Sequence, residues 1–134
     1  MNTFGTIAGY YVDANNVYHG FVRDQRGRFI TSFDAPGAGA GSFQGTLAVG
    51  IDERGVIAGS YIDANNVYHG FVRDADGTVA TFDPPSAGLG ASPGTAVQSM
   101  NEHGAITGYY ADAIRVWHGF IRPVHDVRAI AAAG

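Results

Sequence analysis

The 134-residue chain contains no cysteine and no lysine. The lack of cysteine excludes disulfides, thiolate nucleophiles, iron–sulfur clusters and cysteine-ligated zinc sites. Charged residues make up only 15% of the chain, and 8 basic side chains stand against 12 acidic ones, so the formal net charge is −4. Because this balance gives no positive field to gather phosphates, we expect neither nucleic acid nor an acidic membrane surface as a partner.

Long apolar runs are missing as well. No segment approaches the roughly 20 residues that cross a bilayer, and the first residues lack the basic start and apolar stretch of a signal peptide, so we expect no membrane insertion. Hydrophobic residues nevertheless reach 46% and glycine occupies 20 positions, which favours a folded domain over a disordered chain. The length predicts one domain with one core.

A repeat dominates the sequence. The segment DANNVYHGFVRD at 13–24 recurs unchanged at 63–74, an offset of 50 residues, and a diverged copy, DAIRVWHGFIR, occupies 112–122. We therefore divide the single domain, 1–134, into repeats at approximately 1–45, 46–94 and 95–134. A period of about 50 residues is typical of one propeller blade or of one turn of a longer solenoid.

Within each repeat, short runs rich in Val, Ile, Tyr, Phe and Thr are separated by Gly, Asn and Asp, a pattern that predicts strands and tight turns. In the middle repeat we expect strands at 46–51, 56–62, 67–73 and 78–82. Proline and glycine make 34–41 and 83–94 unsuitable for a ladder, so these segments should cross from one repeat to the next.

The sequence thus predicts an all-β, propeller-like fold with about three four-stranded antiparallel blades per chain. The first blade begins at 5–11, which matches the second strand of the other blades, so eleven strands are expected, with the last at 127–132. Propellers use about 4 to 8 blades, and three cannot close a ring. We expect a homo-oligomer, most simply a dimer, to close it; the alternative is that the chain is a fragment of a longer array.

Two motifs resemble those of the bacterial extracellular HAF-type repeat family. The first is the triplet His-Gly-Phe at 19–21, 69–71 and 118–120, where the family carries a His-Ala-Phe-like triplet. The second is GIDERGVIAG at 50–59 and, less faithfully, SMNEHGAITG at 99–108. The similarity covers nearly the whole chain. It implies a propeller-like β architecture and an extracellular or cell-surface location, but no single activity.

Aromatic residues recur beside an aspartate in all three repeats. Aromatic faces stack on the apolar patches of sugars, while carboxylate and imidazole groups can bond sugar hydroxyls. The candidate ligand-binding residues are Tyr18, Tyr68, Trp117, Asp13, Asp63, Asp112, His19, His69 and His118. We predict a multivalent, lectin-like module with carbohydrate as the favoured ligand, since several weak sites gain avidity together.

The same residues also have structural explanations. For each repeated histidine we favour a hydrogen bond to a neighbouring turn or blade, and the aromatic side chains can pack between blades. The Asp-Ala-Asn-Asn turns at 13–16 and 63–66 suggest calcium, but the third copy has Ile114 and Arg115 instead, which favours Asx turns. A scaffold repeat protein without a small-molecule ligand is therefore the alternative function.

Catalysis finds little support in the sequence. Glu53 and Glu102 occupy equivalent turns of different repeats, which indicates repetition and not a catalytic pair. No nucleophile elbow, phosphate loop or zinc-binding spacing is present, so we expect no catalytic residues, no metal and no cofactor. A lyase or hydrolase of the propeller type is the third hypothesis, because such enzymes assemble their sites from scattered loop residues.

Overall fold

The computed structural model describes residues 1–24, 26, 30–82, 94–112 and 114–123, and these residues form ten strands. They contain no helix, and hence none that could cross a membrane. The all-β prediction is confirmed. The predicted last strand at 127–132 and most of the predicted crossing at 83–94 lie outside the described residues.

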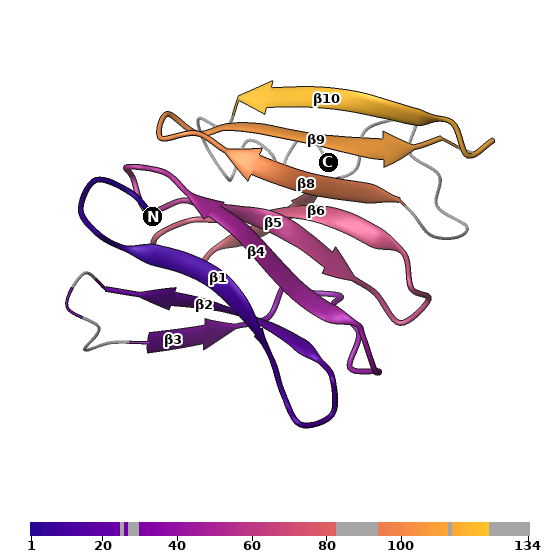
Figure 1. The fold of residues 1–134 in the computed structure, drawn as a ribbon, viewed down its shortest axis with the longest axis horizontal. Coiled ribbons are helices and arrows are strands. Elements are labelled where there is room, and N and C mark those ends of the chain that lie inside the picture. The colour runs from indigo at the N-terminus through magenta and orange to yellow at the C-terminus, as the bar shows by residue number, and fades with distance from the viewer. Residues whose placement is uncertain (25, 27–29, 83–93, 113, 124–134) are drawn as a thin grey trace.

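Consecutive strands pair antiparallel into three units that follow the sequence repeats (Figure 1). The first unit contains β1 (Ile7–Val12), β2 (Tyr18–Arg23) and β3 (Ile30–Phe33). The second contains β4 (Gly45–Ile51), β5 (Ile57–Ile62), β6 (Tyr68–Arg73) and β7 (Val79–Phe82). The third contains β8 (Thr95–Met100), β9 (Ala105–Ala111) and β10 (Trp117–Pro123). Residues 1–6 form no strand, as expected for a first unit that lacks its first strand.

One backbone pair links each unit to the next. Tyr18 pairs in parallel with Gly45, which joins the first two units into a seven-stranded sheet, and Tyr68 pairs in the same way with Gly94 at the edge of the three-stranded third unit. Both glycines have positive φ, and a Cβ on either would lie 2.1 Å from the carbonyl oxygen of its tyrosine partner. Only glycine fits this approach, so the link depends on it.

The units stack face to face, with the first unit at one end and the third at the other (Figure 1). Two apolar clusters fill the two junctions, where a single core was expected. Phe71 and Val72 explain the difference, because both are fully buried neighbours on β6 and strand alternation turns them to opposite junctions. Phe71 belongs to the first-junction cluster with Ile57 and Tyr61, and Val72 to the second-junction cluster with Ile106.

The two junctions are built alike. At the first, the Phe33 and Phe71 rings meet edge to face at 6.0 Å, and the Arg73 guanidinium lies 4.8 Å from the Phe33 ring centre. At the second, Phe82 and Phe120 meet at 6.1 Å, and Arg122 lies 5.0 Å from the Phe82 ring centre. Edge-to-face rings and cation–π contacts each add to apolar burial.

Each unit therefore has two different faces. The face directed toward the preceding unit, here the N-side face, carries the Phe71 type of residue, and the opposite C-side face carries the Val72 type. The N-side face of the first unit and the C-side face of the third have no neighbouring unit among the described residues.

Candidate functional site

Six turns share one hydrogen-bond design. In each, the side-chain Oδ1 of an Asx residue accepts the backbone N–H groups of the residues two and four positions later. The residue three positions after the Asx residue has positive φ. The turns begin at Asn2, Asp13, Asp52, Asp63, Asn101 and Asp112. The turns at Asp13 and Asp63 are thus the Asx turns that the sequence favoured over calcium loops. In each, one carboxylate oxygen accepts hydrogen bonds from the backbone.

The other carboxylate oxygen of Asp13, Asp63 and Asp112 bonds a repeated histidine. The Oδ2 to Nε2 distances are 2.9 Å to His19, 2.8 Å to His69 and 2.9 Å to His118. Each histidine therefore bonds the turn of its own unit, which is the structural role considered above. Both oxygens of these three aspartates already have partners, so they are poorer sugar contacts than the sequence suggested.

A tyrosine completes each Asp–His pair. The register of the hairpins places Tyr11, Tyr61 and Tyr110 opposite the three histidines. The ring centres lie 5.3, 5.0 and 5.1 Å apart, with interplanar angles of 33, 29 and 25°. These nearly parallel rings hold each imidazole against the strand, and the Asp–His–Tyr group thereby fixes the hairpin.

Electrostatics favour the charged form of the pair in the first unit. Hydrogen bonds from His19 and from the Val17 N–H lower the pKa of Asp13. His19 also bonds Asp34 through Nδ1 at 2.7 Å, and its bonds to Asp13 and Asp34 raise its pKa above the ordinary 6.5. A ring that donates from both nitrogens is an imidazolium.

The other two aspartates behave like Asp13. Burial raises the pKa of Asp63, but hydrogen bonds from His69, Val67 and Asn65 outweigh it, so the net shift is downward. The bonds from His118 and the Val116 N–H lower the pKa of Asp112. All three carboxylates therefore stay ionised at neutral pH.

We expect the free energy of unfolding to fall as the pH rises above 6.5 and passes the raised folded-state pKa of His19. The pKa of His19 is higher in the folded state than its ordinary 6.5, so its contribution is complete below pH 6.5 and is lost as the pH passes the folded pKa. Asp13 acts oppositely: its lowered pKa gives a contribution that is present above 3.8 and is lost only in acid. Urea unfolding from neutral to alkaline pH measures the His19 effect, and urea unfolding in acid, below pH 3.8, measures the Asp13 effect.

His19→Gln should flatten the decline between neutral and alkaline pH. His103→Gln is the matched control, because the His103 side chain is 81% exposed and bonds neither Asp13 nor Asp34. Identical pH profiles for wild type and His19→Gln would contradict the assignment.

Two of the predicted aromatic contacts belong to partly exposed ring pairs. Tyr18 meets Tyr10 edge to face, with ring centres 5.7 Å apart, and Trp117 meets Tyr109 in the same way at 5.0 Å. In the second unit, Ser60 takes the place of Tyr10, and its buried Oγ accepts the Val97 N–H. Tyr68 is partly buried, which raises its pKa. The structure thus gives Tyr18 and Trp117 an aromatic partner where the second unit has Ser60, although Tyr18, Tyr68 and Trp117 occupy equivalent positions in the repeats.

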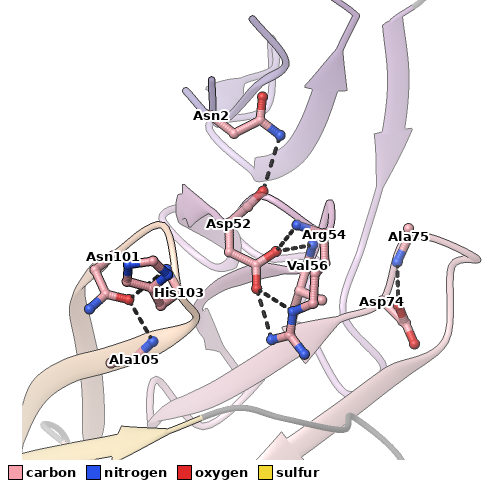
Figure 2. A network of polar contacts seen from close by, with 9 residues as sticks. All are labelled: Asn2, Asp52, Arg54, Val56, Asp74, Ala75, Asn101, His103 and Ala105. Carbon is pink, nitrogen blue, oxygen red and sulfur yellow. Dashed lines mark hydrogen bonds and ion pairs between the residues drawn. The ribbon is translucent and has the colours of Figure 1, made fainter. Parts of the chain in front are cut away.

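Asp52 anchors the turn of the second unit and is fully buried. Its Oδ1 accepts the backbone N–H groups of Arg54 and Val56 at 2.8 and 2.9 Å, and its Oδ2 accepts Nε and Nη2 of Arg54 at 3.1 and 2.9 Å. Figure 2 shows this network and the Asn2 Nδ2 atom, which donates to the Asp52 carbonyl oxygen at 3.0 Å. The turns of the first and second units are therefore hydrogen-bonded to each other.

A cavity of about 450 Å³ lies beside these turns and is lined by residues of all three units, among them Thr3, Glu53 and Glu102. The Glu53 N–H donates to the Glu102 carbonyl oxygen at 3.1 Å, so two residues that occupy equivalent turns of different repeats meet at one site. Side-chain and backbone hydrogen bonds from Thr3 lower the pKa of Glu53. An ionised, doubly bonded Glu53 is unsuited to the general-acid role of a glycosidase.

No family model matches the chain, and no curated protein or solved structure matches it significantly. The resemblance to HAF-type repeats remains a prediction. Within the described ranges, no three His, Cys, Asp or Glu side chains form a group that could hold a metal ion.

Proposed function

We propose that the chain is a multivalent, lectin-like binding module with carbohydrate as its ligand class. The observation that carries the proposal is the two edge-to-face aromatic groups, Tyr10 with Tyr18 and Tyr109 with Trp117, in which every ring but that of Tyr18 is exposed to solvent. Tyr10 is 48% exposed and Trp117 is 54% exposed. Exposed rings with hydroxyl or indole N–H groups at their edges can stack on a sugar and bond its hydroxyls.

The first unit supports this proposal more strongly than the third. The C-side face of the first unit packs against the second unit, through Val22 and Phe33, and yet Tyr10 on the same face stays exposed. The ring pair therefore lies at the margin of a junction and not inside it. We infer that the Asp–His–Tyr groups position the hairpins that carry these rings.

For the architecture, we infer a propeller-like arrangement in which each unit is one blade. Its support is the face-to-face stacking of antiparallel units along the chain, with one backbone pair at each crossing. An extracellular or cell-surface location is part of the same proposal and is supported by the resemblance to HAF-type repeats.

A scaffold without a small-molecule ligand is the second candidate. The observation that favours it is the engagement of both oxygens of Asp13, Asp63 and Asp112 inside their own units. The two functions assign different roles to the exposed rings. A lectin-like module needs them to bind sugar, whereas a scaffold does not.

We expect Trp117→Ala to weaken glycan binding by about tenfold or more, because a lost stacking contact of about 1.4 kcal/mol corresponds to that factor. The variant should stay folded, since the side chain is largely exposed. A glycan array, followed by titration with the free sugar, measures the change. The matched control is Phe43→Ala, which removes an exposed aromatic ring that belongs to neither pair.

Binding that survives both Trp117→Ala and Tyr18→Ala would contradict the assignment of the two ring pairs. A wild-type protein that is folded and binds no glycan would support the scaffold.

A further inference from the structure

The open N-side face of the first unit carries the residue types that face the two junctions. Ile, Tyr, His, Phe and Arg occur at the same five places in every unit, and in the first they are Ile7, Tyr11, His19, Phe21 and Arg23. In the second unit the corresponding Ile57 and Phe71 are fully buried. Tyr61 is 8% exposed there, whereas Tyr11 on the open face is 42% exposed.

The open C-side face of the third unit is the counterpart. Ile121 on β10 is 73% exposed, whereas Val72, at the same place in the second unit, is fully buried in the second-junction cluster. At the first junction, Val22 occupies this place and packs in one cluster with Ile57. A unit that followed the third one would therefore contact Ile121 through the residue at its Ile7 position.

We propose that these two faces bind each other between two copies of this chain, head to tail, so that the third unit of one copy packs on the first unit of the next. The new interface continues the stack of two established junctions and repeats their contacts. The proposed interface shares the C-side face of the third unit with the Tyr109–Trp117 pair. The corresponding face of the first unit is covered in the first junction and yet Tyr10 stays 48% exposed, so assembly and sugar binding are compatible and are tested by separate variants.

The proposed interface also repeats a polar contact of the first junction. Asn2 Nδ2 donates to the Asp52 carbonyl oxygen across the first junction, and Asn101 begins the equivalent turn of the third unit. In the proposed interface, Asn101 Nδ2 donates to the carbonyl oxygen of Asn2 in the second copy. That acceptor is the first unit's equivalent of the Asp52 carbonyl.

A head-to-tail interface uses two different surfaces, so each copy keeps one free face until a ring closes. Two copies close a ring with two identical interfaces. This arrangement predicts how variants with one damaged face behave alone and in mixtures.

The test uses Ile7→Lys to damage the N-side face and Ile121→Lys to damage the C-side face, because a lysine buried opposite an apolar side chain is strongly unfavourable. Thr78→Lys, in an exposed turn of the second unit, is the matched control. Molar mass is measured by sedimentation or light scattering across a concentration series. We expect wild type and Thr78→Lys to assemble, and each interface variant alone to be monomeric, with the dissociation constant raised at least about a hundredfold.

An equal mixture of the two interface variants should form a dimer through the one undamaged pair of faces. This result also shows that both variants are folded. A monomeric wild type at high concentration would overturn the proposal, and so would assembly that survives either lysine. A mixture that forms no dimer beyond those of the separate variants would equally overturn it, and a variant that still dimerises alone would indicate a symmetric interface.

Discussion

Gly59→Ala should lower the free energy of unfolding by about 3 kcal/mol, as overpacking against a fixed backbone does. Gly59 lies in β5 between β4 and β6. A Cβ there would lie 2.2 Å from the Leu47 carbonyl oxygen and 2.8 Å from the Phe71 Cε1 atom. The backbone atom cannot move aside, because the irregular register between Ala48 and Gly50 brings β4 against this position.

Gly9→Ala is the matched control for this prediction. Gly9 occupies the same place in the first unit, but that unit lacks the strand equivalent to β4, and an added Cβ meets only the Phe21 ring at 3.1 Å. A ring can shift, so we expect a loss below about 1 kcal/mol. Urea unfolding of both variants measures the difference, and equal losses would show that the missing strand is not the reason.

Asp52→Ala should lower the free energy of unfolding by about 2 to 3 kcal/mol, because it leaves the Arg54 and Val56 N–H groups without their acceptor near a buried turn. Asp52→Asn keeps the Oδ1 acceptor, and asparagine occupies this place at Asn2 and Asn101. We expect Asp52→Asn to cost about 1 kcal/mol or less. Urea unfolding at neutral pH separates the two variants.

If both substitutions at Asp52 destabilise equally, the ion pair with Arg54 is the important interaction and the turn design is not. If neither does, the carboxylate is dispensable.

The strands could be predicted from the sequence because the repeat fixes their places. The expected strand at 46–51 corresponds to β4, and the one at 67–73 to β6, with boundaries that differ by one residue. The turn at 2–5 was not predicted, since Asn-Thr-Phe-Gly shares few letters with Asp-Glu-Arg-Gly at 52–55. The signal that could have found it is an Asx residue three positions before glycine, at the repeat offset.

The candidate site could be predicted only in part. Asp13 and His19 lie six residues apart, and their contact depends on the hairpin register, which the sequence does not state. Glu53 and Glu102 come together only because whole units stack. The exposure that separates Trp117 from Tyr68 depends on which neighbour covers each unit, and that is a property of the stack.

Two of the strands described above, β2 and β6, have the same six-residue sequence, and this identity creates a hazard during folding. β1 could pair with β6 in the register it uses with β2, which would trap the chain in a strand-swapped state. The Asx turn at Asp13 opposes this error, because it closes the β1–β2 hairpin over a few residues, whereas β1 and β6 are separated by a loop whose closure costs more entropy. The Asx turns at the repeated aspartates thus favour the local pairing of each hairpin over pairing with the identical strand of another unit.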